Sequence, residues 1–310
     1  MAATDARRSI RVSRSRRWVP VSRWAAAAVL AAGLALALAA PSAAASDARP
    51  GTTGPTGVQA KAAAIAVAST GRVLWSRDLN TEVPMASITK VMTALVVIRA
   101  GHLGRRITVP SAVIGYVDEY DASSAGLWPG DTLTAAQLLE ALLLPSGADA
   151  AYTLAEAYGP GLSTFIAKMN ATAKRLGMTR TRFSNFDGLP YPTGYSTYST
   201  PANLLKLGRV AMASAVFRSI VDRRSYEVAS GSGHHAYLWV NLNPLLGVYR
   251  GAIGIKTGFT PAAGHCLLFE ATRDGRSFIG VNLDSPGVGT TVNGAAATRM
   301  LNWAFSLPSR

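Results

Sequence analysis

The sequence predicts an α+β protein: a mainly antiparallel sheet flanked by helices, together with a helical lobe. Three observations support this prediction. Strand patterns occur near both ends of the chain, helical patterns fill the region between them, and 49% of the 310 residues are hydrophobic. A chain of this length and composition can bury a large core. Because the strand patterns enclose the helical region, we expect both ends of the chain to contribute to one sheet.

The elements are predicted in the following order. AAAIAVAST and RVLWSRD are strand patterns that a Thr-Gly turn joins as a β-hairpin. Helical patterns dominate from 86 to about 223, and one of them opens with Thr200 and Pro201, which is typical of a helix start. Strand patterns return in RSYEVAS, RGAIGIKTGFT, HCLLFEATRD and RSFIGVNLD, with an Asp-Gly turn between the last two. The closing GAAATRMLNWAFSL is again helical.

The first 45 residues have the layout of a secretory signal peptide. A basic stretch precedes the 16-residue apolar run AAAAVLAAGLALALAA, and small residues follow it. The run is short for a spanning helix, which favours cleavage over the alternative of an uncut membrane anchor. We therefore expect an exported protein, by the Sec or the Tat route, with a linker over 46–60 and one folded domain over 61–310. Contact with a membrane is expected only if the N-terminal segment stays uncut.

Charge, cysteine and histidine content exclude several classes of function. Of the net charge of +14, the signal-like segment accounts for +6, and no stripe of Lys and Arg interleaved with aromatic residues occurs elsewhere, so we expect no nucleic-acid partner. Cys266 is the only cysteine and is expected to be a buried strand residue. His234 and His235 lie in a Gly/Ser loop without other metal-ligand types, so we expect no metal.

Ser87 and Lys90 stand at the front of the apolar helical stretch PMASITKVMTALVVIRAG. One helical turn separates them, so their side chains share a face. A desolvated Lys with a lowered pKa can remove the proton of a serine hydroxyl, which Arg cannot do near neutral pH. The alternative is a structural pair, in which Ser87 caps the helix and Lys90 reaches solvent. Taken alone, the pair is more typical of that alternative.

Two further motifs contain groups that can take part in the same chemistry. Ser146 and Gly147 occupy a turn in LLLPSGADAA, where a hydroxyl can relay a proton to a leaving amine. Lys256, Thr257 and Gly258 lie on the predicted strand GAIGIKTGFT, where an ammonium and a hydroxyl can bind a substrate carboxylate and Gly258 allows close approach to the backbone. The alternatives are an ordinary helix connection and a surface turn.

The ordered set S-x-x-K, S-G-x and K-T-G, which begins at 87, 146 and 256, resembles the signature of penicillin-binding proteins and serine β-lactamases. Over about 58–308, stretches such as FSNFDGLP, YSTPANLLKLGR and GIKTGFTPAAGHCLLFEATRD are similar to the low-molecular-mass D-alanyl-D-alanine carboxypeptidases of peptidase family S11. The resemblance implies a DD-peptidase/β-lactamase-like fold and makes 61–310 a DD-peptidase (transpeptidase-like) catalytic domain. It implies no metal and no cofactor.

The resemblance also implies a role for each motif. Ser87 would attack the carbonyl of the penultimate D-alanine of a peptidoglycan stem peptide, with Lys90 as base, and water would release the acyl-enzyme. Ser146 would pass a proton to the departing D-alanine. β-Lactam antibiotics are implied as covalent inhibitors. The implied substrate-binding residues, which hold the terminal carboxylate and the oxyanion, are Lys256, Thr257, Gly258 and Phe259.

One position departs from the family pattern, because Ala148 stands where S-x-N has Asn. Losing that amide costs on the order of 1–3 kcal/mol of transition-state stabilisation, so a catalytically weak peptidoglycan- and penicillin-binding protein is an alternative function. A class A-like β-lactamase is a second alternative, but it needs a Glu that drives deacylation. The Glu residues between the motifs do not lie in an E-x-x-x-N pattern; they are Glu119, Glu140, Glu156 and Glu227. We expect an extracytoplasmic serine-type D-Ala-D-Ala carboxypeptidase, in the cell wall or secreted.

Overall fold

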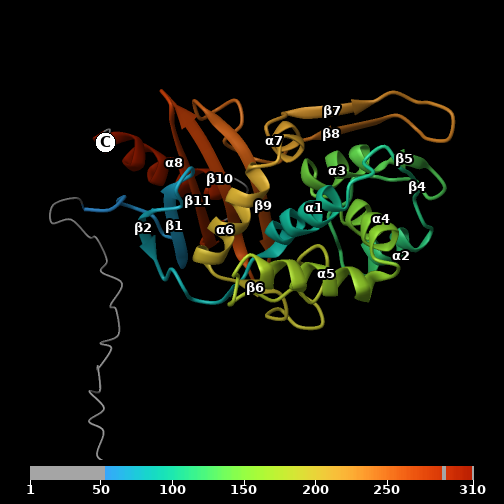
Figure 1. Cartoon of the computed structure of the whole chain (residues 1–310), viewed down its shortest axis with the longest axis horizontal. Helices are drawn as coiled ribbons and strands as arrows, with labels where there is room; N and C mark the ends of the chain where they lie inside the picture. The colour runs from blue at the N-terminus through green and yellow to red at the C-terminus, as the bar shows by residue number, and fades with distance from the viewer. Residues whose placement is uncertain (1–52, 288–290, 309–310) are drawn as a thin grey trace, which may run out of the picture. The chain divides into compact units, whose positions relative to one another are not determined.

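The computed structural model describes residues 53–287 and 291–308. Its centre is a five-stranded antiparallel sheet (Figure 1). The strands lie in the order β2 (Val73–Arg77), β1 (Ala62–Val67), β11 (Arg276–Ser285), β10 (Gly264–Arg273) and β9 (Ala252–Thr260). Because β1 pairs with β11 along its whole length, both ends of the domain build one sheet, and this prediction is confirmed.

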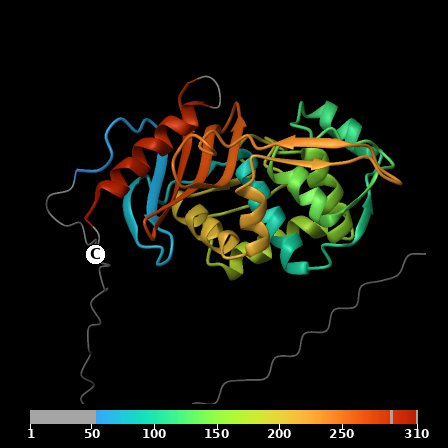
Figure 2. The same ribbon diagram turned by 90° about the horizontal axis from the view of Figure 1, so that it is seen from above.

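Helices cover both faces of the sheet, as strand alternation requires. On β1, Ile65 belongs to a core cluster with α8 (Thr291–Ser306), whereas Ala64 belongs to the larger cluster that includes α6 (Pro201–Met212). Both views show α8 and α6 on opposite sides of the strands (Figures 1 and 2). The sheet is therefore buried on both faces, which explains its nearly continuous apolar strands.

A helical lobe lies beside the β9 edge (Figure 1). It consists of η1 (Ala86–Ile88), α1 (Thr89–Ala100), α2 (Ala112–Glu119), α3 (Ala135–Leu143), α4 (Ala148–Tyr158) and α5 (Leu162–Arg175). Two short antiparallel strand pairs accompany these helices. β3 (Val83–Pro84) pairs with β6 (Tyr198–Ser199), and β4 (Arg106–Thr108) pairs with β5 (Thr132–Thr134). The short helix α7 (Ala215–Val221) packs against β9.

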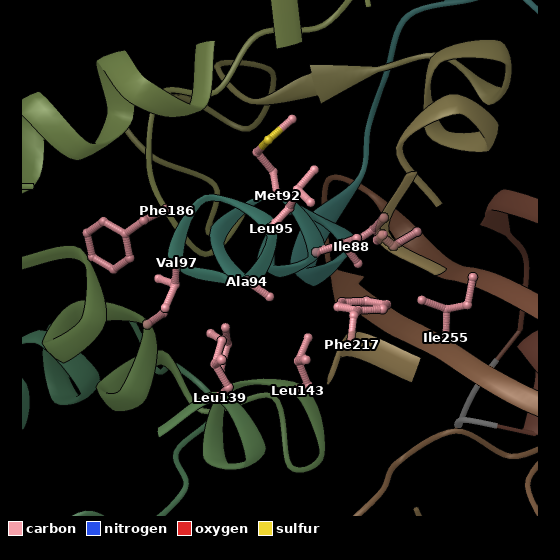
Figure 3. Close-up of a cluster of buried hydrophobic side chains, with 14 of the residues drawn as sticks. Ile88, Met92, Ala94, Leu95, Val97, Leu139, Leu143, Phe186, Phe217 and Ile255 are labelled. Atoms are coloured by element: carbon pink, nitrogen blue, oxygen red, sulfur yellow. The ribbon is translucent and has the colours of Figure 1, made fainter. Parts of the chain in front are cut away.

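Helix α1 runs through the middle of this lobe, and residues on all its sides are buried. Figure 3 shows Leu139 and Leu143 of α3 below this helix. It also shows Ile88, at the start of the helix, beside Phe217 of α7 and Ile255 of β9. Because the first turns of α1 are buried on every side, a charged group there has no solvent-exposed face. A lysine there must be desolvated.

Five short strands are absent from the sequence prediction: β3, β4, β5, β6 and β8 (Tyr237–Val240), of which β8 is the longest. β8 pairs with β7 (Ser225–Val228), and the resulting hairpin extends over the lobe (Figures 1 and 2). The Gly/Ser loop joins the two strands of this hairpin. In this loop the His235 backbone N–H donates to the Asp131 carboxylate, and the His235 ring Nδ1 lies 2.9 Å from Asp131 Oδ1. The alternation of buried Trp239 with exposed Leu238 is the strand signal in HHAYLWV that the prediction overlooked.

The N-terminal end of the chain lies largely outside the described residues, and so does the expected signal peptide. Where the expected linker enters the described part, Val58 and Ala60 are already buried against the α8 side of the sheet. Within 53–287 and 291–308, no helix combines the length and the hydropathy that crossing a bilayer demands.

Candidate active site

Ser87 lies in the 3₁₀ turn η1, immediately before α1 begins at Thr89. Ile88 is the N-cap residue of α1, and neither helix has a side-chain cap hydrogen bond. The structural interpretation of Ser87 as a helix cap is therefore wrong. The hydroxyl is half-buried and faces the side chain one turn further on.

Lys90 does not reach solvent, because its side chain is only 1% exposed. Its Nζ donates to Ser87 Oγ over 3.1 Å and to the backbone oxygen of Asp187 over 3.3 Å. Burial lowers the pKa of Lys90, while the nearby carboxylates of Asp187 and, more weakly, Asp149 act in the opposite direction. The amine is thus shifted toward its neutral form within hydrogen-bonding distance of the hydroxyl. This arrangement is what a general base for Ser87 requires.

The K-T-G motif lies on β9, the edge strand that faces η1, and not in a surface turn. Gly258 is in direct contact with the serine segment: a Cβ added to it would lie 3.1 Å from the Ser87 nitrogen. Lys256 is 1% exposed, and its Nζ donates to the Thr257 oxygen over 3.1 Å. Burial and the positive charge of Lys90 hold the pKa of Lys256 well below its ordinary value. Phe259 exposes 57% of its surface at the end of the motif.

Ser146 lies in the connection between α3 and α4, two helices that pack against α1. Its backbone has a positive φ of 67°, a conformation that non-glycine residues seldom adopt. Its Oγ is buried and has no hydrogen-bond partner within the described residues. A buried hydroxyl without a partner is costly, and it remains available to a bound molecule.

The connection around Ser146 is anchored from the preceding loop. Ser123 Oγ donates to the Ser146 oxygen over 2.7 Å, and the Ala148 nitrogen donates to the Ser123 oxygen over 2.7 Å. Asp149, the first acidic residue of α4, accepts from Ser124 Oγ over 2.6 Å and from backbone N–H groups of the same loop. Ala148 itself is fully buried and brings no polar side chain to the site.

Sequence reasoning assigned no role to Asp187, whose backbone accepts from Lys90, or to Tyr116, which binds the Asp187 side chain. The Asp187 carboxyl is fully buried, and its Oδ2 accepts from the Tyr116 hydroxyl over 2.7 Å. Burial raises the pKa of Asp187, and Lys90 opposes this. The only signal in the sequence was a polar residue before a glycine in FSNFDGLP.

The prediction that Cys266 is a buried strand residue is confirmed. Cys266 is buried in β10, where burial raises the pKa of its thiol to about 12. Glu156 is exposed on α4. The described residues contain no group of three or more His, Cys, Asp or Glu side chains that could hold a metal ion.

Direct contacts thus join Ser87 with Lys90 and with Gly258, while Lys256 is close enough for the charge of Lys90 to affect it. An amine shifted toward neutrality beside a hydroxyl is the requirement of serine-type acyl transfer. This pair of groups, on a five-stranded sheet with a helical lobe, defines a serine-type hydrolase.

Comparison with known proteins defines the family. Peptidase family S11, described as D-alanyl-D-alanine carboxypeptidase, matches residues 49–287. The chain belongs to this family of serine-type D-Ala-D-Ala carboxypeptidases, which are penicillin-binding proteins of low molecular mass.

The relatives include two bacterial carboxypeptidases and a solved structure. The chain is 39% identical to the D-alanyl-D-alanine carboxypeptidase of Streptomyces sp. strain K15, covering 77% of this chain and 84% of that protein. It is 40% identical to a D-alanyl-D-alanine carboxypeptidase of Mycobacterium tuberculosis, covering 78% and 81%. The crystal structure of the Streptomyces K15 DD-transpeptidase superposes with a TM-score of 0.77 at 38% identity, over 83% of this chain and all of that chain. The predicted α+β, DD-peptidase-like fold is confirmed.

Proposed function

We propose that this protein removes the terminal D-alanine from peptidoglycan stem peptides through an acyl-enzyme on Ser87. The observation that carries this proposal is the 3.1 Å contact between the buried amine of Lys90 and the Ser87 hydroxyl. Family membership supplies the class of peptide bond, D-Ala-D-Ala.

In the first step, the neutral amine of Lys90 takes the hydroxyl proton as Ser87 Oγ bonds to the carbonyl carbon of the penultimate D-alanine. We assign the developing oxyanion to the backbone N–H groups of Ser87 and Phe259, and the contact of Gly258 with the serine segment supports this assignment. Collapse of this intermediate breaks the C–N bond. The Ser146 hydroxyl gives its proton to the departing amine, and the proton held by Lys90 replaces it, so Lys90 becomes neutral again. Water then attacks the ester and releases the shortened peptide.

Lys256 and Thr257 lie on the edge strand beside the serine, where an extended peptide can run along β9. We assign to them the terminal carboxylate of the substrate, because an ammonium and a hydroxyl give it charge-assisted hydrogen bonds. Burial and the charge of Lys90 lower the pKa of Lys256, and the negative charge of a bound carboxylate would act in the opposite direction and stabilise the ammonium form.

Labelled penicillin tests the nucleophile. The purified protein is expected to bind the label covalently, and Ser87→Ala is expected to abolish labelling without loss of thermal stability. An unlabelled wild-type protein, or equal labelling of Ser87→Ala, contradicts the proposal.

A synthetic pentapeptide ending in D-Ala-D-Ala tests the reaction. We expect mass spectrometry to show a tetrapeptide and free D-alanine in water. Because the similar proteins include one named a carboxypeptidase and one named a transpeptidase, the same assay is run with an acceptor amine. A predominance of amide product would make transfer to an amine the main reaction.

A catalytically weak wall-binding protein is the second candidate, and Ala148 is the observation that favours it. Peptide binding without detectable tetrapeptide would support this candidate. The β-lactamase alternative has less support: Glu119, Glu156 and Glu227 are exposed, and Glu140 pairs with Arg223 over 3.5 Å. Rapid turnover of a penicillin, in place of a persistent adduct, would favour it.

We further propose that the protein is exported and acts on the wall outside the cytoplasm. The N-terminal sequence and the nature of the substrate support this. Cell fractionation, with N-terminal sequencing of the mature protein, tests both the location and cleavage near Ala45.

A further inference from the structure

The segment 185–188 lies directly on the first turns of α1. The Thr93 hydroxyl donates to the Phe186 oxygen, and Lys90 donates to the Asp187 oxygen over 3.3 Å. Gly188 packs so closely on η1 that a Cβ added to it would lie 1.9 Å from the Ala86 oxygen. The backbone of this segment is thus fixed against the helix that carries the serine and the lysine.

The segment is also braced internally. Asn185 is fully buried, its Oδ1 accepts from the Gly188 nitrogen over 2.7 Å, and its Nδ2 donates to the Leu189 oxygen over 2.8 Å. A turn closed on both sides by one amide has little freedom to move. The Asp187 carbonyl is therefore a rigid acceptor for the amine of Lys90.

The carboxyl group of Asp187 is held in place as firmly as its carbonyl. Its Oδ2 accepts from the Tyr116 hydroxyl over 2.7 Å, and its Oδ1 accepts from the Leu189 nitrogen over 3.2 Å. Tyr116 OH in turn lies 3.0 Å from Tyr191 OH. A fully buried carboxylate is costly unless donors and a countercharge stabilise it, and Lys90 supplies that charge when it is protonated.

Position 148 contributes nothing comparable. Ala148 is fully buried, and its methyl group can neither accept from Lys90 nor compensate a charge. An amine offers several donors that need acceptors in a buried site. Among the residues that the structure describes, the acceptors of Lys90 Nζ are Ser87 Oγ and the Asp187 oxygen.

We propose that Asp187, held by Tyr116, is the positioning residue of Lys90 and supplies the acceptor and the countercharge that no side chain at 148 provides. This inference rests on the proposed role of Lys90 as base. In the neutral amine, one N–H donates to the Asp187 oxygen and the lone pair faces the Ser87 hydroxyl. When the proton moves from Ser87 Oγ to Nζ, the ammonium forms beside a carboxylate.

Two other charged groups face Lys90 from neighbouring elements. Asp149 of α4 raises its pKa less than Asp187 does, and its oxygens are occupied by N–H and hydroxyl donors of the 124–127 loop. Lys256 of β9 carries a like charge when it is protonated. Asp187 is therefore the main group that opposes the effect of burial on Lys90, and its loss must lower the pKa of Lys90 further.

The test compares wild type with Asp187→Asn, which keeps the shape and the backbone carbonyl but removes the charge. Acylation by labelled penicillin requires neutral Lys90, so its rate rises with pH through the pKa of Lys90. We expect the rising limb to move to lower pH by about one unit in Asp187→Asn, and the maximal rate to fall about tenfold because the base is weaker and less well oriented. Superimposable profiles overturn the proposal.

A direct titration separates this inference from the proposed function. The chain has six lysines, so ¹³C-lysine NMR can follow each of them, with Lys90 assigned from the resonance that Lys90→Arg loses. We expect Lys90 to titrate at lower pH in Asp187→Asn than in wild type. This readout needs no catalysis: if penicillin fails to acylate wild type, the proposed function fails, yet the effect of Asp187 is still measured. An unchanged midpoint overturns the inference.

Tyr116→Phe provides a second variant, with Tyr158→Phe as its matched control. Like Tyr116, Tyr158 is a tyrosine of the helical lobe with a hydrogen-bonded hydroxyl, but its hydroxyl donates to the Gly101 oxygen at the far end of α1. We expect Tyr116→Phe to slow acylation about fivefold or more and to alter the pH profile, while Tyr158→Phe keeps the wild-type rate and profile. Equal behaviour of the two variants contradicts the role of Tyr116.

Discussion

The amine of Lys90 is hydrogen-bonded at once to the hydroxyl of Ser87, three residues before it, and to the backbone oxygen of Asp187, 97 residues after it. The first contact is set by helical spacing and the second by the packing of a distant turn. Together they hold one nitrogen between a nucleophile and an acceptor, in a place from which water is largely excluded.

Lys90→Arg is expected to abolish acylation by labelled penicillin, because a guanidinium keeps its proton near neutral pH and cannot act as a base. Circular dichroism should show a folded protein. Lys206→Arg is the control, since Lys206 is exposed and donates to the Gly177 oxygen. Normal acylation by Lys90→Arg would show that another group removes the serine proton.

Ser146→Ala is expected to lower carboxypeptidase turnover about 100-fold without lowering the free energy of unfolding. The reason is that Ser146 Oγ is buried without a partner, so its removal breaks no hydrogen bond within the described structure. Thr172→Ala is the control, because the Thr172 hydroxyl donates to the Lys168 oxygen over 2.8 Å.

The control should lose about 1 kcal/mol of stability and no activity. Pentapeptide hydrolysis and urea denaturation measure the two quantities. Wild-type turnover in Ser146→Ala would exclude the proposed proton relay.

Gly188→Ala is expected to lower both acylation and stability strongly. Its φ of +89° disfavours any side chain, and the new Cβ would overlap the Ala86 oxygen, so the Asp187 turn would be pushed off η1. Gly177→Ala controls for the φ effect: Gly177 has a φ of +66°, but the nearest atom to an added Cβ is Lys206 Nζ, 3.8 Å away.

We expect the control to lose about 1 kcal/mol of stability and to keep its acylation rate. Thermal melting and penicillin labelling provide the measurements. If both variants acylate equally, contact between the turn and η1 is not needed for the reaction.

Glu140 predicts a pH dependence of stability that does not involve the active site. Burial raises its pKa to about 7, although Arg223 opposes this, and its Oε2 has no hydrogen-bond partner within the described residues. Because the folded-state pKa is above the unfolded one, this group's contribution to stability is complete below about pH 4.5 and is lost as pH rises through 7.

The loss amounts to about 3 kcal/mol at most. Glu140→Gln should remove this slope, whereas Glu156→Gln, at an exposed position of α4, should keep it. Urea denaturation between pH 4 and 8 on the three proteins gives the comparison. An identical slope in wild type and Glu140→Gln would mean that Glu140 is charged and compensated in the folded state.

Regular periodicity made most of the fold predictable. The β1–β2 hairpin, the three C-terminal strands and α8 all lie where alternation and turn residues indicated. Strand β8, the longest of the missed strands, has only four residues and follows a loop of Gly, Ser and His, so its alternation is too short to stand out from that loop. It is stabilised by contacts with the lobe, such as Trp239 Nε1 donating to the Ala125 oxygen over 2.9 Å.

The site was predictable to the extent that it depends on spacing. Ser87 and Lys90 are one turn apart, and no tertiary contact is needed for their side chains to meet. By contrast, the sequence could not distinguish a cap from a nucleophile, because that depends on whether the amine is buried. Asp187 and Tyr116 were missed because a single polar residue in a turn or on a helix forms no sequence pattern. Nothing local indicates that it will contact a residue far along the chain.

The sequence by itself determined the α+β architecture, the order of the three motifs and the pairing of Ser87 with Lys90, since each depends on local periodicity or short spacing. The tertiary structure alone decided that Lys90 is desolvated, that Gly258 touches the serine segment, and that Asp187 is the carboxyl beside the amine. The physical reason is that desolvation and Coulomb interactions depend on what packs around a group in space. In this protein those neighbours come from helices, a turn and a strand that folding alone brings together.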